Sequence, residues 1–425
     1  MKRPVAIDLF AGCGGMSLGL EAAGFDIAIA VELDPIHTLV HHFNFPYGVS
    51  VCKDIAELQA KDLLQALESQ GFDPEIDLIA GGPPCQGFSH MGKRQLNDPR
   101  NSLVFEYLRM IKAIKPKYFL FENVPGIASG QQKTILAELI AEFESIGYSV
   151  QKPVAILNAS DYGAPQNRKR LILIGSRLDV NPAIYPEKTH SATNPGESFV
   201  FKDQSMATCE EAIGDLIKHH VYIESDQGID SSKLDYSGFR KSFALQPSGR
   251  FNLCHTRTVS HRVYGHIGSN HSEKSSDRFA VTSPGTVEPV SRFFKLSADG
   301  QCNTLRAGTS SDKGSHTAPR PINYAIPRCI TVREAARLHT FPDWFRFHNT
   351  IWHGFREIGN AVIPFLAQSL GCEIIKAMKL NPQEFKTYTL NQQDEKLLSY
   401  SMSQALKYWH IPDNVIPKRK RRIRL

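Results

Sequence analysis

One cysteine follows an apolar run and a turn of glycines and prolines, in residues 76–89, IDLIAGGPPCQGFS. Glycine permits a sharp exit from a strand, and proline stiffens the loop that follows. A core cysteine needs no such control of the backbone. Cys85 could be a structural thiol, a metal ligand, a disulfide partner or a nucleophile. The eight cysteines of the chain show no framework spacing, which disfavours disulfides.

A second glycine turn follows the first apolar run, in residues 6–25, AIDLFAGCGGMSLGLEAAGF. A strand, a glycine turn and a helix in this order form a nucleotide-type cofactor site, because the backbone can approach a ligand and the helix N-terminus offers free N–H groups. Gly12 and Gly14 fit the first two positions of G-x-G-x-x-G, but Ser17 occupies the third. The full dinucleotide fingerprint is therefore absent.

Two acidic residues follow this turn at positions that suit an adenosine. Glu32 ends the next apolar run and can accept hydrogen bonds from both ribose hydroxyls. Asp54, in CKDIAEL, can reach an adenine amino group. These features suggest an adenosine-containing ligand without a required pyrophosphate, and S-adenosylmethionine fits. A tight packing turn is the alternative at this point.

The order of these and later motifs resembles the C5-cytosine DNA methyltransferase family, in its prokaryotic modification methylase form. The resemblance covers roughly residues 4–177 and 320–378, over half the chain. The motifs that carry it are DLFAGCGGMSLGL, GGPPCQGFS, DPRNSLVFEYLRMI (98–111), ENVPG (122–126), QNRKR (166–170), TVREAARLHTFPD and GNAVIP (359–364).

The resemblance assigns four catalytic residues. Cys85 matches the nucleophile, whose thiolate adds to cytosine C6 so that C5 can attack a methyl group. Glu122 matches the acid that protonates or hydrogen-bonds N3, so it must carry a proton there. Arg168 matches the arginine that grips cytosine O2, and we expect Arg170 to contact a phosphate or a loop. No residue identifies the base that removes the C5 proton.

The resemblance also assigns the residues that bind S-adenosyl-L-methionine. The last motif implies that the C-terminal helix returns to pack beside the first strand, so that the large domain is discontinuous. We expect no metal, because one cysteine with irregularly spaced histidines (254, 255, 261 and 266) is a weak signal. The expected cofactor-binding residues are Phe10, Gly12, Gly14, Glu32, Asp54, Pro83, Asn101, Asn360 and Val362.

Short apolar runs alternate with helical patterns over the first 180 residues. The runs 4–10, 25–33, 76–82, 117–123 and 170–177 read as strands. The alternation predicts an α/β fold with a doubly wound, mainly parallel sheet. The resemblance makes this sheet Rossmann-like, of the type found in AdoMet-dependent methyltransferases. Helices are expected over 131–147, 331–339 and 358–378.

The amino-acid composition changes near residue 181, where Ser, Gly, His, Asn and Thr become frequent. We expect a catalytic first part at 1–180, a smaller irregular target-recognition domain at 181–320, a returning catalytic part at 321–385, and a C-terminal extension at 386–425. Base flipping is implied, with the two domains clamping the DNA. Candidate base-contacting residues are Arg257, Arg262, Arg278, Arg292 and Arg306.

The net charge of +6 belongs to the end of the chain. Six of the 49 Lys and Arg residues lie within 418–424, and the other 43 balance the 43 Asp and Glu. A basic tail attracts polyanions through counterion release. It could contact nucleic acid or form a solvated terminus.

We expect a cytoplasmic, monomeric enzyme on double-stranded DNA, with a cognate restriction endonuclease as functional partner. No apolar run approaches the ~18–20 residues of a membrane span. A tRNA cytosine methyltransferase of the same fold and a catalytically silent DNA-binding protein are the main alternatives. A nicotinamide dehydrogenase is disfavoured by Ser17 and by the cysteine loop.

Overall fold

The computed structural model describes residues 1–84, 102–130, 132–191, 204–258, 260–308, 320–391 and 393–412. Cys85, Asn101 and the basic tail lie outside these ranges.

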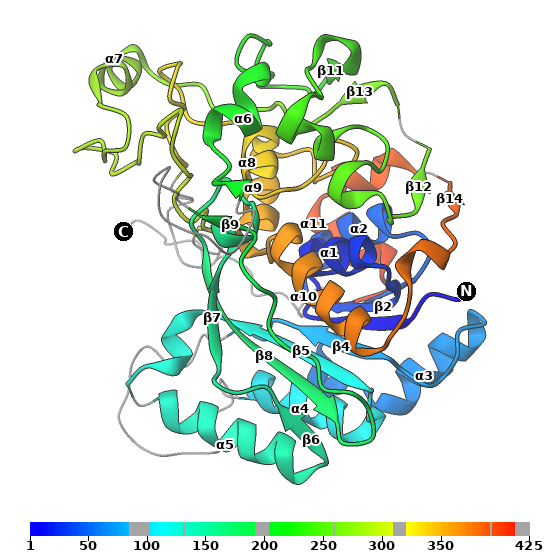
Figure 1. The fold of residues 1–425 in the computed structure, drawn as a ribbon. Helices are drawn as coiled ribbons and strands as arrows, with labels where there is room; N and C mark the ends of the chain where they lie inside the picture. The colour runs from blue at the N-terminus through cyan, green and yellow to red at the C-terminus, as the bar shows by residue number, and fades with distance from the viewer. Residues whose placement is uncertain are drawn as a thin grey trace, which may run out of the picture.

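An eight-stranded sheet forms the centre of the protein (Figure 1). Its strand order is β3-β2-β1-β4-β5-β8-β6, and β7 also pairs with β8. Strands β1 to β5 are parallel, whereas β8 runs antiparallel to β5, β6 and β7. The sheet is therefore mixed: it is mainly parallel, as expected, but β8 is reversed, which was not expected. The strands are β1 Val5–Leu9, β2 Asp26–Glu32, β3 Val49–Cys52, β4 Leu78–Gly81, β5 Tyr118–Asn123, β6 Tyr148–Val150, β7 Ala155–Asn158 and β8 Lys169–Arg177.

Helices cover both faces of this sheet, because its strands carry apolar side chains on both sides (Figure 1). In β1, Ile7 packs with one core and Ala6 with the other. Helices α1, α2 and α10 belong to the face of Ala6, and α3, α4 and α5 to the face of Ile7. The bounds are α1 Gly15–Ala23, α2 Pro35–Asn44, α3 Ala60–Ser69, α4 Ser102–Ile114, α5 Gln132–Ser145 and α10 Pro364–Ala377.

Helix α10 returns from the end of the chain to pack on α1, next to the first strand (Figure 1). A Cβ added at Gly19 would lie 2.4 Å from the Ala367 Cβ, so glycine permits the close approach of the two helices. The expected helix over 358–378 is two helices, α9 Ile351–Asn360 and α10. The break comes before Pro364, because the residue preceding a proline is pushed out of the helical region and Ile363 is extended.

The stretch Ile351–Ala377 is long and apolar enough to cross a membrane by composition, with a mean hydropathy of 1.4. No run was expected to approach this limit, and this stretch meets it by length and composition only. In the structure, 78% of its most apolar window is buried inside the protein. Its apolar side chains therefore pack in the protein core, where α10 lies against α1.

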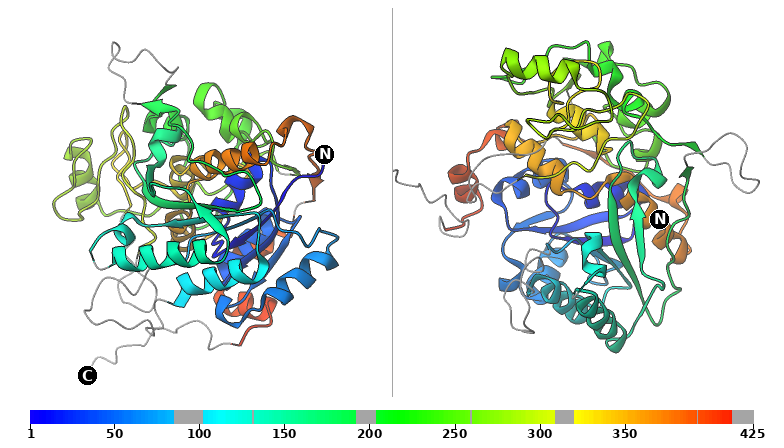
Figure 2. Two further views of the ribbon diagram at one scale, coloured as in Figure 1. Left: turned by 60° about the horizontal axis from the view of Figure 1, so that its bottom comes forward. Right: turned by 90° about the vertical axis from the view of Figure 1, so that its left-hand side faces the viewer.

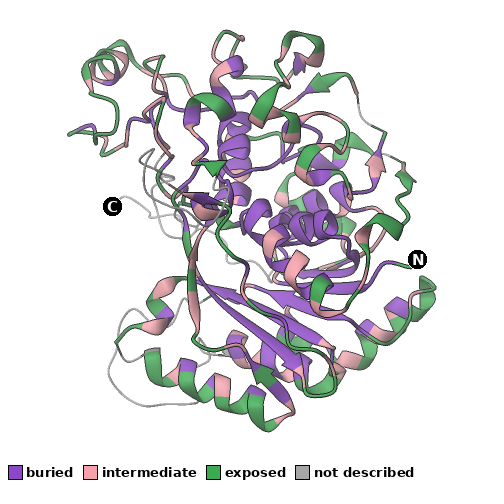
Figure 3. Ribbon diagram, in the orientation of Figure 1, coloured by how far each residue is buried: buried purple, intermediate pink, exposed green. Residues whose placement is uncertain are grey.

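Residues 204–308 contain short elements joined by long loops, at the top of Figure 1. Helix α8, Val332–Leu338, packs under them and begins at the expected N-cap, Thr331, which forms a capping box with Glu334. Figure 3 shows that α8 is buried whereas α7 is largely exposed. The elements of this part include α6 Cys209–Ile213, β11 Ile229–Asp230, β12 Thr256–Arg257, β13 Arg262–Val263 and α7 Glu273–Val281.

The remaining elements are short. Two views in Figure 2 show that the C-terminal helix α11 lies against the large part of the protein, and it packs on α2. The short strands are β9 His190–Ser191, β10 Gln204–Ser205 and β14 Thr389–Leu390, and α11 spans Met402–Tyr408. The 3-10 helices are η1 Ile55–Glu57, η2 Pro125–Ala128, η3 Ala159–Tyr162, η4 Gly214–Leu216, η5 Ser231–Lys233, η6 Gly238–Phe243, η7 Gly249–Phe251, η9 Pro382–Glu384 and η10 Glu395–Ser399.

Candidate active site

The turn before Cys85 lies against the end of strand β5. An ideal Cβ built on Gly82 would lie 2.8 Å from the Glu122 Oε2 atom, so only glycine fits there without a shift. The Asn123 side-chain amide donates a 3.0 Å hydrogen bond to the Pro83 carbonyl oxygen. Pro83 itself is buried. The turn that leads to Cys85 therefore lies beside the Glu122 carboxylate. The described residues end one position before Cys85.

Glu122 forms an ion pair with Arg170. The Arg170 Nε lies 2.6 Å from Glu122 Oε1, and both side chains are mostly buried, with 13% and 12% of their surface exposed. The two residues face each other because β8 runs antiparallel to β5, with Glu122 opposite Ile172. Low exposure strengthens such a charge-assisted pair. A substrate that contacts this carboxylate must therefore compete with Arg170 for it.

Arg168 lies in the interior, where its guanidinium bonds backbone carbonyls. Its Nη1 donates to the Leu305 carbonyl at 2.8 Å, and its Nη2 donates to the Gly359 and Ala361 carbonyls at 2.9 and 3.1 Å. Only 3% of the residue is exposed, and burial lowers the pKa of its guanidinium to about 9. The expected contact between Arg168 and cytosine O2 does not fit this placement, since the side chain is buried and both terminal nitrogens donate to backbone carbonyls. Arg170 is the arginine beside Glu122.

The first glycine turn contacts Glu32. The Gly12 N–H donates to Glu32 Oε2 at 2.9 Å, and the Asp34 N–H donates to Oε1 at 2.8 Å. Glu32 ends β2, which pairs with β1, so its carboxylate stands next to the turn that follows β1. A Cβ added at Gly12 would meet no atom within 4 Å, so the turn borders open space. The Glu32 carboxylate therefore lies beside the open side of this turn.

The last motif contacts this turn directly. A Cβ added at Gly15 would lie 2.3 Å from the Val362 carbonyl oxygen and 2.9 Å from the Ala361 Cβ. The Cys13 thiol donates to the Glu357 carbonyl at 3.6 Å. The backbone that carries Asn360 and Val362 is thereby placed at the turn formed by Gly12 and Gly14. Asn360 is exposed at the end of α9, and Val362 is buried.

The other expected cofactor residues that the structure describes lie around the same sheet edge. Phe10 is half-buried in a left-handed conformation, with a φ of 63°. Asp54 is half-buried, and its side chain accepts a hydrogen bond from the Ala56 N–H at 3.0 Å as the cap of η1. Asn101 lies outside the described residues. Thus all but one of the expected cofactor residues are placed, on the turn, on neighbouring strand ends or on the returning motif.

A buried polar chain beneath the glycine turn was not expected from the sequence. Ser17 Oγ donates to Asp8 Oδ2 at 2.6 Å and contacts His41 Nε2 at 3.0 Å, and His41 Nδ1 lies 3.1 Å from Ser50 Oγ. Burial raises the pKa of Asp8 to about 7 and lowers that of His41 to about 3. The only sign of this chain in the sequence was Ser17 at the third fingerprint position. A glycine there could not form these hydrogen bonds.

Replacing Asp8 by asparagine should change how stability depends on pH. Between pH ~4 and ~7 the folded protein holds a proton on Asp8 that the unfolded chain releases, so the free energy of unfolding falls as the pH rises. Glu357, whose pKa is also raised to about 7 by burial, acts in the same direction. The free energy of unfolding, measured with urea, should fall between pH 5 and 7.5 by ~1–3 kcal/mol less in Asp8→Asn than in the unsubstituted protein. An unchanged pH dependence would contradict the assignment.

Two of the histidines considered for a metal have other partners. His255 Nε2 lies 3.1 Å from Asp26 Oδ1, and His266 Nδ1 lies 3.1 Å from Thr331 Oγ1. Cys254 is buried. Within the described part of the chain, no group of three or more His, Cys, Asp or Glu side chains is arranged to hold a metal ion.

The five candidate arginines of the irregular part differ in exposure. Arg257 is buried, and its Nη2 pairs with Glu21 Oε2 at 2.7 Å, so it cannot face DNA as expected. Arg278 pairs with Glu288 at 3.2 Å. Arg262, Arg292 and Arg306 are exposed.

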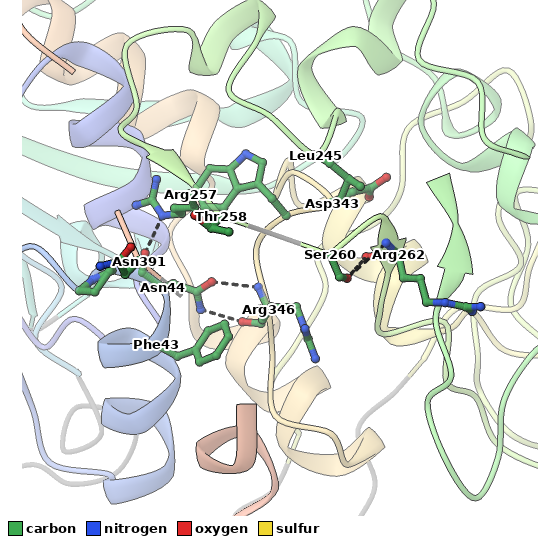
Figure 4. A pocket seen from close by; sticks show the side chains of 12 residues that line it. Phe43, Asn44, Leu245, Arg257, Thr258, Ser260, Arg262, Asp343, Arg346 and Asn391 are labelled. Carbon is green, nitrogen blue, oxygen red and sulfur yellow. Dashed lines mark hydrogen bonds between the residues drawn. The ribbon is translucent and has the colours of Figure 1, made fainter. Parts of the chain in front are cut away.

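Arg257 and Arg262 lie in the wall of a pocket that contains none of the expected catalytic or cofactor-binding residues (Figure 4). The Arg257 Nε donates to the Asn44 carbonyl at 2.8 Å, and its guanidinium lies over the Trp344 ring at 4.3 Å from the centroid. Asn44 in turn bonds the Arg346 backbone at both its N–H and its carbonyl. The bonds from Arg257 and Arg346 to Asn44 attach the irregular part and the loop after α8 to the end of α2.

Comparisons of the sequence identify relatives over almost the whole chain. The family model described as C-5 cytosine-specific DNA methylase matches residues 5–376. The chain is 43% identical to the type II methyltransferase M.XorII of Xanthomonas oryzae pv. oryzae, over 99% of this chain and 96% of the relative. It is 34% identical to the type II methyltransferase M.DdeI of Desulfomicrobium norvegicum, over 86% of each chain.

Solved structures agree with this relationship. A prophage-encoded E. coli protein assigned as a DNA modification methyltransferase superposes with a TM-score of 0.72 at 32% identity, over 89% of this chain and all of the other. The S. pombe Dnmt2 methyltransferase superposes over the same shares at 17% identity and a TM-score of 0.57, which shows the fold alone. The chain therefore belongs to the C-5 cytosine-specific DNA methylase family and is a DNA cytosine-5 methyltransferase of the type II restriction–modification kind.

Proposed function

We propose that this DNA methyltransferase takes its methyl group from S-adenosyl-L-methionine and attacks a flipped cytosine through Cys85. One observation carries the proposal: β1 and β4 are adjacent parallel strands, with Leu9 opposite Gly81. The carboxyl ends of parallel strands meet at one sheet edge, so the glycine turn after β1 and the turn that leads to Cys85 after β4 leave the sheet side by side. A methyl donor and a nucleophile on these two turns would meet.

The residues around the first turn fit such a donor. The open space at Gly12, the Glu32 carboxylate and the N-terminus of α1 provide room for an adenosine and an acceptor for its ribose hydroxyls. A bound sulfonium would supply an electrophilic methyl carbon. The acidic side chains near the turn suit its positive charge. Phe10, Asp54 and Asn360 are proposed to complete the site, together with Asn101.

In the proposed reaction the Cys85 thiolate adds to C6 of the cytosine, which makes C5 nucleophilic enough to accept the methyl group. Glu122 donates a proton or a hydrogen bond to N3, where negative charge develops. Arg170, whose guanidinium lies at Glu122, is proposed to contact cytosine O2 once the base displaces part of the ion pair. Loss of the C5 proton then expels Cys85. We assign to Arg168 a separate role, described below.

The irregular part of the chain is proposed to recognise the target sequence. We propose that this domain spans residues 181–320 and that the returning catalytic part spans residues 321–385. A contact between the basic tail and DNA is also proposed. The exposed Arg262, Arg292 and Arg306 are available to bases or phosphates. We further propose a cytoplasmic monomer that protects DNA from a cognate restriction endonuclease.

Expression in a bacterial host that lacks cytosine-5 methylation tests this function. Bisulfite sequencing of the host genome should show full methylation of one cytosine in one short sequence, and none in cells that express Cys85→Ala. Host tRNA should carry no added 5-methylcytosine. Methylation confined to tRNA would instead support the RNA enzyme, and unmethylated DNA and tRNA would support a silent DNA-binding protein.

Replacing Glu32 by alanine should weaken binding of S-adenosylmethionine. The substitution removes the proposed ribose acceptor and also the acceptor of the Gly12 and Asp34 N–H groups. Loss of hydrogen bonds to a charged group predicts a dissociation constant ~10–100-fold higher by calorimetry. Glu68→Ala, on the exposed face of α3, is the matched control and should bind as the unsubstituted protein does. Equal affinity of the Glu32 and Glu68 variants would exclude this role.

A further inference from the structure

Arg168 joins three stretches of chain that are far apart in the sequence. It belongs to the segment that leads into β8, and its three hydrogen bonds reach the carbonyls of Leu305, Gly359 and Ala361. The first of these carbonyls belongs to the irregular part and the other two to the last motif. A buried guanidinium that donates to backbone oxygens fixes their positions more tightly than an apolar contact, because each bond is directional and charge-assisted.

Two further buried side chains complete this contact. Gln166 accepts from the Leu305 N–H at 3.1 Å and donates to the Leu338 carbonyl at 3.2 Å. Its amide also lies 3.1 Å from His339 Nδ1, and His339 Nε2 contacts the Ala361 carbonyl at 3.0 Å. Gln166 and His339 are fully buried. We call Gln166, Arg168 and His339 the clamp.

The backbone on both sides of the clamp is packed closely. A Cβ added at Gly359 would lie 2.3 Å from the Ala307 nitrogen, so the last motif and the irregular part touch backbone to backbone. The Asn167 N–H donates to the Cys302 carbonyl at 2.8 Å, and Thr304 Oγ1 donates to the Asn167 carbonyl at 2.7 Å. Residues 302–307 therefore cannot shift without moving residues 166–168 or Gly359.

Each stretch held by the clamp leads to a group with a different task. In the proposed function, Asn360 and Val362 bind the methyl donor. Asn360 lies between the two residues whose carbonyls Arg168 holds, and Val362 follows the second of them. Arg306 follows Leu305 and is exposed, in the part that would face DNA. Arg170, two residues after Arg168, holds Glu122. The clamp is the point where the donor site, the irregular part and the catalytic acid meet.

We propose that Arg168 is a positioning residue that couples binding of the methyl donor to binding of the target DNA. The proposal rests on the proposed function, because it needs Asn360 and Val362 at the donor. When DNA fixes residues 302–307, the clamp holds the 359–361 backbone in its donor-binding position, and the donor acts on DNA binding in the reverse direction. Thermodynamic linkage makes the two effects equal.

Measurement of S-adenosylmethionine affinity with and without the target duplex tests the proposal. In the unsubstituted protein, the dissociation constant from calorimetry should be about tenfold lower with DNA. In Arg168→Lys it should differ less than about twofold between the two conditions, because a single ammonium cannot hold three carbonyls in a fixed fork. The KM for S-adenosylmethionine should rise accordingly, whereas kcat at saturation changes less.

Arg250→Lys is the matched control. Arg250 also donates to backbone and side-chain oxygens across the domain, at Tyr162, Phe365, Gln368 and Ser369, and burial lowers its pKa to about 10. It touches neither residues 302–307 nor residues 359–361. This variant should lose thermal stability as Arg168→Lys does, but it should keep the tenfold effect of DNA.

A second variant keeps the test decisive if Arg168→Lys does not fold. His339→Phe retains the ring that stacks on Phe341 and removes the contacts to Gln166 and Ala361, so the effect of DNA should fall to about threefold. The tenfold effect surviving in either folded variant, or its absence from the unsubstituted protein, would overturn the proposal. An unsubstituted protein that binds no S-adenosylmethionine at all would refute the proposed donor instead.

Discussion

Replacing Cys85 by alanine is expected to abolish methyl transfer to DNA while both substrates still bind. Without the thiolate, cytosine C6 receives no nucleophile, and C5 stays part of an aromatic ring that does not attack a methyl group. Loss of a covalent nucleophile predicts a kcat at least ~10⁴-fold lower. Transfer of a tritiated methyl group to the target duplex measures this rate, and a gel shift with the same duplex measures binding.

Two other cysteines serve as controls for that result. Cys52 ends β3 and Cys372 lies on α10, and both are half-buried and unpaired by disulfides. Alanine at either position should leave the rate within about threefold, since neither belongs to the proposed chemistry. Methyl transfer by Cys85→Ala at a rate near that of these controls would exclude the covalent mechanism.

Replacing Glu122 by glutamine should give the second largest loss. An amide has nearly the same shape, but it cannot transfer a proton to N3 or form the ion pair with Arg170. General acid catalysis contributes ~10²–10⁴-fold, so kcat should fall by that factor, with the affinity for S-adenosylmethionine unchanged. Single-turnover methylation of the target duplex isolates the chemical step from product release.

Glu106→Gln provides the matched control for this substitution. Glu106 also forms a close pair with an arginine, Arg109, at 2.7 Å on α4, but it lies outside the proposed site. It should methylate as the unsubstituted protein does. If Glu122→Gln and Glu106→Gln react equally fast, the carboxylate at the end of β5 does not act on the cytosine ring.

Local patterns in the sequence predicted the elements that carry the site. The strand, turn and helix around Gly12 form as expected, and Glu32 stands where an acid after the next strand should stand. The apolar run 170–177 predicted the strand β8, but not its reversed direction. That direction depends on how β6 and β7 connect it to β5, which an apolar run does not encode.

The roles of the two arginines of QNRKR could not be separated from sequence alone. Arg168 and Arg170 are two residues apart, and in a regular strand such residues would point to the same face. Arg168 precedes β8, which begins at Lys169, so the strand pattern does not fix its direction. Which one faces Glu122 depends on the pairing of β8 with β5, and the partners of Arg168 lie 137 to 193 positions further along the chain. The expectation that Arg257 contacts DNA was wrong for the same reason, because its partner Glu21 is 236 positions away.

The buried chain of Asp8, Ser17 and His41 shows a further limit. Each of these residues has an ordinary explanation on its own, in a strand, a helix or a helix turn. Their contact requires α1 and α2 to lie side by side over β1, which only the folded sheet brings about. Sequence reasoning recorded Ser17 as a mismatch to a fingerprint, whereas the structure gives it a hydrogen-bonding role.

Covalent trapping on a duplex that carries 5-fluorocytosine at the target position tests the central claim most directly. Fluorine at C5 cannot leave as a proton does, so the adduct between Cys85 and C6 should persist after methyl transfer. With S-adenosylmethionine present, the account predicts a complex that survives denaturing electrophoresis, with the modified peptide containing Cys85, and no complex from Cys85→Ala. A folded protein that binds both substrates but forms no complex, or that attaches through another residue, would contradict it.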